Sequence, residues 1–135
     1  MPPTAGMDTR EIVEDFVKAI NSGRAEKVVQ GMHLDAVFID SLGNRIEGRK
    51  ALLDGWRGYY QLFPDYRIEV EGMIVEDQEA LLRGWASGTL RRGGRTAEGG
   101  NWRIPAAWRA VTDSRRVLLW QVFADNKPVY ALLGQ

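Results

Sequence analysis

Asp40 is the residue whose type and position in the chain best support chemistry. It ends an apolar run, Asp35-Ala-Val-Phe-Ile-Asp40, and the turn-forming segment Ser41-Leu-Gly-Asn44 follows at once. Burying a carboxylate costs several kcal/mol unless it is paired or neutralised. Either Asp40 faces an apolar pocket, where desolvation would make it a useful general base, or it caps the turn through the amides of Leu42 or Gly43.

A second carboxylate, Asp125, closes the apolar segment Trp120-Gln-Val-Phe-Ala124. It is a candidate for an auxiliary acid or base, or for a group that orients a water molecule. The alternative is an Asx-turn, because Asp125-Asn126 leads directly into Lys127-Pro128. Asp40 and Asp125 are therefore the two candidate catalytic residues.

Aromatic side chains are frequent, with five Trp among 135 residues. On the helix expected near residues 49–63 they fall at steps of three and four, and on the strand expected at 101–112 Trp102 and Trp108 share one face. Such stripes belong to a core more often than to a ligand pocket. The candidates for lining a pocket are Phe16, Trp56, Tyr60, Trp85, Trp108 and Trp120.

Composition excludes several classes of function. Lys+Arg and Asp+Glu both count 18, so the chain lacks the basic excess of a protein that binds nucleic acid or an anionic membrane. No apolar run approaches the roughly 20 residues of a membrane span, and the first residues lack signal-peptide features, so we expect a cytoplasmic protein. Without Cys and with His33 alone, we expect no metal site and no cofactor.

The patterns along the chain predict an α+β fold. Residues 1–7 are expected to form a flexible tail and residues 8–135 a single domain. Helices are predicted at about 8–21, 25–32 and 49–63, and strands at 36–40, 66–75, 79–90, 101–112 and 116–124, with a flexible basic hairpin loop over 91–100. The order α-α-β-α-β-β-β-β predicts a cone, in which three N-terminal helices pack on a strongly curved, mostly antiparallel mixed sheet.

Pro105, inside a predicted strand, indicates an edge position or a bulge. Trp102 and Trp108 flank it, so this strand is not expected to lie bare. Arg103 and Arg109 share its other face and are interpreted as solvated or as part of a subunit contact. An apolar sheet surface of this kind usually marks an interface.

Four segments resemble the nuclear transport factor 2-like superfamily, in its SnoaL-like and ketosteroid-isomerase-like branch. They are Phe16-Val-Lys-Ala-Ile-Asn-Ser-Gly23, Asp35-Ala-Val-Phe-Ile-Asp40, Ile46-Glu-Gly-Arg-Lys-Ala-Leu52 and Trp120-Gln-Val-Phe-Ala-Asp125. The resemblance places Asp40 where ketosteroid isomerases keep their general base. It places Phe16 and Ala107 where those enzymes keep the two donors to an enolate oxygen, which argues against steroid isomerisation of that type.

The same resemblance implies a homodimer, since members of this superfamily commonly pair two subunits through the open face of the sheet. It also implies a function. Asp125 occupies the place of an Asp that orients water in limonene-epoxide-hydrolase-like members, but Arg83-Gly84-Trp85 lacks the Arg-x-Asp of those enzymes. The leading hypothesis is a small cofactor-independent isomerase, cyclase, lyase or hydrolase that acts on a small hydrophobic molecule. The alternative is a non-catalytic module of the same fold that binds a small ligand or serves dimerisation.

Overall fold

The computed structural model describes residues 7–134, so the predicted tail over residues 1–7 lies, Met7 apart, outside the described part. The first helix, α1 (Thr9–Asn21), begins where the Asp8 carboxylate accepts a hydrogen bond from the backbone N–H of Glu11 at 2.8 Å. Such an N-cap stabilises a helix by about 1 kcal/mol. The helix ends ahead of Gly23, whose positive φ of 71° suits a chain reversal.

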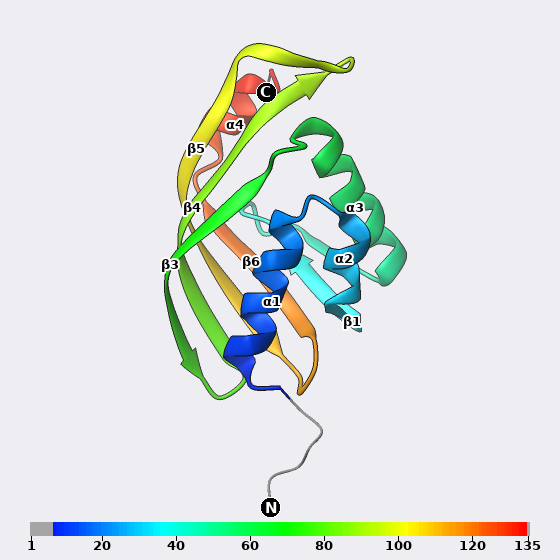
Figure 1. The fold of residues 1–135 in the computed structure, drawn as a ribbon, viewed down its shortest axis with the longest axis vertical. Helices are drawn as coiled ribbons and strands as arrows, with labels where there is room; N and C mark the ends of the chain where they lie inside the picture. Colours follow the sequence, from blue (N-terminus) through cyan, green and yellow to red (C-terminus); the bar gives the residue numbers. More distant parts are fainter. Residues whose placement is uncertain (1–6, 135) are drawn as a thin grey trace, which may run out of the picture.

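The other elements form one six-stranded sheet and three further helices. The strand order is β2-β1-β6-β5-β4-β3, with β1 and β6 parallel and the other neighbours antiparallel. Helices α1 to α3 cover the concave side of this curved sheet, and α4 follows the last strand (Figure 1). The elements are α2 (Ala25–Gln30), β1 (Met32–Ile39), β2 (Arg45–Glu47), α3 (Arg49–Leu62), β3 (Arg67–Glu76), β4 (Glu79–Arg92), β5 (Arg95–Thr112), β6 (Val117–Ala124) and α4 (Lys127–Leu132).

The predicted α+β cone is confirmed, with two elements added. Strand β2 pairs with β1 through only three residues, too short a segment for its alternation to be distinguished from a turn. Helix α4 lies beyond the last predicted strand, and it has Pro128 in its first turn, where a missing N–H costs nothing. Met32, expected to end the second helix, instead begins β1.

The prediction of a flexible loop over residues 91–100 is wrong. Strands β4 and β5 continue through this segment to Arg92 and Arg95, which pair across the two-residue turn Gly93-Gly94. Both glycines have positive φ, 57° and 75°, as a tight hairpin turn requires. The glycines therefore mark one reversal, and not a long irregular segment.

The sheet bends where Gly84 of β4 meets a bulge in β3. The register between these strands shifts between Val70 and Gly72. A Cβ atom at Gly84 would lie only 1.8 Å from the carbonyl oxygen of Glu69, so no other residue fits without moving the backbone. This close approach strengthens the curvature that creates the hollow on the concave side.

Alternation along β5 separates the core from the convex face. Residues from Trp102 to Thr112 alternate between buried and more exposed, as the sequence predicts. At Pro105 one side of β5 has no neighbouring strand, because β6 ends opposite Ala106. This is the edge position that a proline in a strand needs.

On the convex face, charged groups surround exposed apolar side chains. The Arg103 guanidinium lies 4.0 Å from the ring centroid of Trp85, and Arg109 pairs with Glu79. The side chains of Leu81 and Phe123 are each 49% exposed. No helix within residues 7–134 has the length and apolar character needed to cross a membrane.

Candidate functional site

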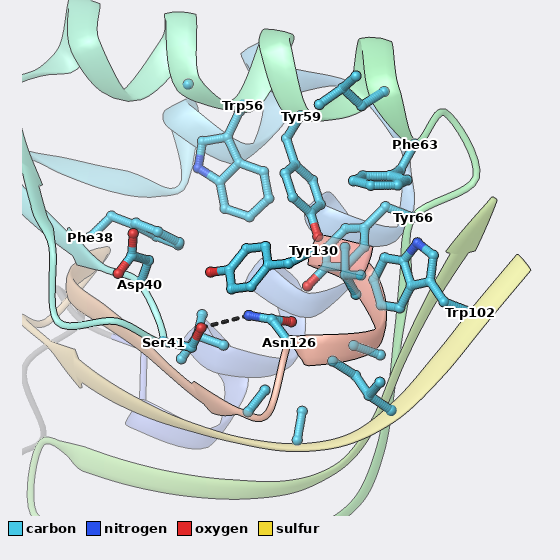
Figure 2. A pocket seen from close by; sticks show the side chains of 18 of the residues that line it. Phe38, Asp40, Ser41, Trp56, Tyr59, Phe63, Tyr66, Trp102, Asn126 and Tyr130 are labelled. Carbon is cyan, nitrogen blue, oxygen red and sulfur yellow. Dashed lines mark hydrogen bonds between the residues drawn. The ribbon is translucent and has the colours of Figure 1, made fainter. Parts of the chain in front are cut away.

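The concave side of the sheet holds a cavity of about 320 Å³. Helix α3 lies along one side, α4 closes another, and strands β1, β5 and β6 form the floor (Figure 2). The wall is mostly aromatic and aliphatic, as in many small-molecule sites. Its aromatic members are Phe38, Trp56, Tyr59, Phe63, Tyr66, Trp102, Trp120 and Tyr130, and its remaining polar side chains are Asp40, Ser41 and Asn126.

Asp40 borders the cavity and also caps its own turn. It lines the cavity at the end of β1 and is half-buried. Its Oδ1 accepts hydrogen bonds from the backbone N–H groups of Leu42 and Asn44, both at 2.9 Å, and its Oδ2 accepts one from the Asn44 side chain at 3.1 Å. The turn therefore fixes the carboxylate in position while one face of Asp40 reaches the cavity. It is the only carboxylate in the described lining.

Asp125 is not part of this cavity. Its side chain is exposed, and its Oδ1 accepts a hydrogen bond at 3.0 Å from the backbone N–H of Lys127, at the start of α4. This is the Asx-turn that the sequence offered as the alternative. The neighbouring Asn126 is the residue that lines the cavity, and its side-chain amide donates to the hydroxyl of Ser41 at 2.5 Å.

Of the six aromatic candidates, Trp56 and Trp120 line the cavity. Phe16 and Trp108 are core residues that pack on Trp120 from behind, with ring centroids 4.9 Å and 6.3 Å from it. Neither of the two is in the lining, whereas Trp120, which both contact, is. The pattern of spacing identified all of them as buried without telling which of them border empty space.

The two remaining candidates also lie outside the lining. The Tyr60 hydroxyl donates to the backbone carbonyl of Ile20 at 2.6 Å and so joins α3 to α1. Trp85 projects from the convex face beneath Arg103, because odd-numbered residues of β4 alternate away from the core. Ala107, where the family resemblance expected a donor, is on the same face, opposite Phe123.

Three tyrosines that sequence reasoning missed bring hydroxyl groups to the cavity. They are Tyr59 of α3, Tyr66 just before β3 and Tyr130 of α4. Burial raises the pKa of Tyr59 and of Tyr66 above the ordinary tyrosine range, and nearby phenols would repel each phenolate further. Both groups are thus neutral donors near pH 7. The aromatic stripe of α3 was a signal for Tyr59, whereas the sequence around Tyr130 gives none.

Comparisons with known proteins identify the fold. IdmH from Streptomyces antibioticus, a proposed polyketide cyclase, is 20% identical; the alignment covers 96% of this chain and 100% of IdmH, with a TM-score of 0.76. A protein from Catenulispora acidiphila with a ketosteroid-isomerase-like fold, crystallised with trimethylamine, is 14% identical, with 92% of each chain covered and a TM-score of 0.79. At these identities the likeness concerns the fold.

A third solved structure is a SnoaL-like protein from Shewanella denitrificans, proposed to be a polyketide cyclase. It is 13% identical over 93% of this chain and 96% of its own, with a TM-score of 0.79. No protein of curated function matches the chain. The model of the SnoaL-like domain matches residues 13–120, most of the sequence. The chain therefore belongs to the SnoaL-like family, within the nuclear transport factor 2-like superfamily.

Proposed function

We propose that this protein is a small enzyme that binds a hydrophobic molecule in its aromatic cavity and uses Asp40 to move a proton. The observation that carries the proposal is a single carboxylate in the described lining of a mostly apolar cavity of about 320 Å³. A base positioned against a desolvated ligand is the arrangement that proton transfer at carbon requires. The C–H bond breaks, the proton moves to an Asp40 oxygen, and the electron pair remains on the ligand.

Proton transfer at carbon unites the reaction classes that the proposal includes. Isomerisation returns the proton to another atom of the ligand, while cyclisation and elimination use the carbanion to form or break another bond. Each can proceed with one carboxylate that alternates between base and acid. The proposed cyclase activity of IdmH and of the Shewanella protein is in keeping with this chemistry.

The first experiment is a thermal-shift screen with aromatic, terpenoid, steroid and polyketide-like carbonyl compounds. A compound that binds the native state raises the melting temperature. Each hit is then incubated in D2O, and NMR follows the exchange of its carbon-bound protons for deuterium. We expect exchange with the wild type and a loss of at least about 100-fold with Asp40→Asn, the range of general-base contributions.

The matched control is Asp35→Asn. Asp35 lies on the same strand, but its side chain is 91% exposed and does not line the cavity. Asn at position 40 keeps an oxygen acceptor for the two turn amides, so the fold should persist. Equal exchange rates in wild type and Asp40→Asn would refute the role of Asp40.

The second candidate is a non-catalytic ligand-binding module. It is favoured by the three hydrogen bonds that Asp40 accepts within its own turn, which give the residue a structural task without any reaction. In that case hits in the thermal-shift screen would bind wild type and Asp40→Asn alike. None of their protons would exchange faster with protein than without it.

A further inference from the structure

Asp40 is a half-buried carboxylate for which the fold provides no countercharge. Its three hydrogen-bond donors, two backbone N–H groups and the Asn44 side chain, are all neutral. Within residues 7–134 the ion pairs of Lys, Arg and His involve other carboxylates, such as Glu26 with Arg57. A carboxylate has about four acceptor sites, so it retains capacity for one further contact.

The cavity that Asp40 borders also lacks a positive charge. Its described lining contains no Lys, Arg or His, so Asp40 is the only residue of a charged type there. Most of the wall is apolar, and surroundings of low polarity strengthen the interaction between two charges. This arrangement attracts a cation and repels a carboxylate or a phosphate.

Aromatic rings supply the second component of a cation site. Phe38 and Trp56 have ring centroids 5.8 Å apart with their planes at 76°, so their faces point in different directions. Figure 2 shows both rings at the end of the cavity where Asp40 lies, and the Tyr130 hydroxyl points toward the same end. The face of an aromatic ring is electron-rich and attracts a cation within about 6 Å of its centroid. The carboxylate and the rings therefore converge on one part of the cavity.

The kind of cation follows from the hydrogen bonds that this part of the cavity can offer. A primary ammonium carries three N–H donors and a guanidinium five, and each donor needs an acceptor when it leaves water. Acceptors near Asp40 are few, because Ser41 and Asn126 are bonded to one another and most of the wall is apolar. A tertiary ammonium has one N–H and a quaternary ammonium has none, so these ions fit the carboxylate and the rings best.

We propose that Asp40, together with Phe38, Trp56 and Tyr130, forms a site for the tertiary or quaternary ammonium group of a mostly apolar amine. The inference rests on the proposed function, since it requires that the cavity bind a small molecule, and it names the class of that molecule. Positive charge on the nitrogen makes the neighbouring C–H bonds more acidic. An ammonium held here would bring those bonds to the carboxylate that is proposed to remove a proton.

The test compares phenyltrimethylammonium with tert-butylbenzene, two molecules of nearly the same shape that differ in a positive nitrogen against a neutral carbon. NMR titration of the full chain in sealed tubes gives the Kd of each probe, with the indole N–H signals as reporters. Wild type is expected to bind the cation about 10- to 100-fold more tightly than the neutral probe. Asp40→Asn should lower this ratio at least about 5-fold while the Kd of tert-butylbenzene stays unchanged.

Two further variants separate the rings from the overall charge. Tyr130→Leu keeps an apolar side chain at a half-buried position and removes the ring, so the ratio should fall about 2- to 5-fold. An unchanged ratio would exclude this ring from the site. Asp35→Asn is the charge-matched control, because it removes the same charge from an exposed position of β1 outside the lining. It should leave the ratio as it is in wild type.

The outcomes distinguish this inference from the proposed function. Equal affinity of wild type for the two probes, or a cation preference that persists in Asp40→Asn, would overturn the ammonium site and leave the proposed ligand cavity standing. An equal loss in Asp35→Asn would also overturn it, since the preference would then report the overall charge of the protein. If neither probe bound to the wild type, both proposals would be contradicted. A preference that depends on Asp40 and Tyr130 supports the ammonium site, and deuterium exchange at carbon then tests the enzymatic role separately.

Discussion

Replacing Gly84 by alanine tests the bend that creates the cavity. The added Cβ would lie 1.8 Å from the carbonyl oxygen of Glu69 and 2.8 Å from its carbonyl carbon. Since real Cβ contacts do not fall below 3.0 Å, β3 and β4 would have to separate by about 1.2 Å. Both atoms belong to the backbone, so no side-chain rotation can relieve the contact.

The size of the expected stability loss follows from the hydrogen bonds that this separation of β3 and β4 breaks. A shift of this size stretches the neighbouring β3–β4 hydrogen bonds beyond useful length, at about 0.5–1.5 kcal/mol each. Overpacking adds about 1–3 kcal/mol. With about two such bonds lost, we expect Gly84→Ala to lower the free energy of unfolding by about 2–6 kcal/mol, a large part of the 5–15 kcal/mol typical of a domain.

Urea denaturation followed by tryptophan fluorescence measures this change. Gly58→Ala is the matched control, because the position lies within α3 and an added Cβ there meets no atom within 4 Å. Alanine is a better helix former than glycine, so this variant should gain up to about 1 kcal/mol. If Gly84→Ala stayed within 0.5 kcal/mol of wild type while Gly58→Ala gained stability, the reasoning on the bend would be refuted.

Three further predictions concern the tyrosines and the convex face. Tyr60→Phe should cost only about 1 kcal/mol in urea denaturation, because the Ile20 carbonyl keeps its bond from the Gly23 N–H at 3.2 Å; a loss above 3 kcal/mol would contradict this. Burial raises the pKa of Tyr59 and of Tyr66, so the folded protein keeps two protons that the unfolded chain loses near pH 10. Stability should therefore fall above about pH 10, by at most about 1.4 kcal/mol per pH unit for each group. Urea denaturation at pH 8.5, 10 and 11 checks that decline, and constant stability would exclude it. We also propose that the convex face pairs two copies of the chain, so light scattering should report a dimer that Leu81→Arg or Phe123→Arg converts to monomers, whereas a monomeric wild type would refute the pairing.

Local sequence patterns were sufficient to predict the helices and strands that have strong apolar periodicity. Helix α1 and strand β5 follow directly from apolar spacing, since each buries one face against a large core. Strand β2 and helix α4 have three and six residues, and their structure depends on the partners they pack against. The segment over residues 91–100 was misjudged because its glycines and arginines resemble a loop, although the sheet extends through it.

The site was predictable only in part for a related reason. Asp40 could be found because a carboxylate at the end of an apolar strand is chemically unusual. Trp56 and Trp108 have similar sequence signals, yet only Trp56 borders the cavity, since that depends on how layers stack in three dimensions. Tyr130 lies 90 residues after Asp40 in the sequence, and only the completed fold brings the two to one cavity.

The parallel pairing of β1 with β6 has a consequence for how the chain must fold. Val37 pairs with Leu119, so the contact closes a loop of about 80 residues before it gains any hydrogen bond. Contacts this distant in sequence slow folding, and during synthesis β1 must wait until most of the chain has left the ribosome. The apolar side of β1 is meanwhile exposed to other chains. Because β1 and β6 are far apart in the sequence, we expect refolding to be slow and to compete with aggregation at high protein concentration.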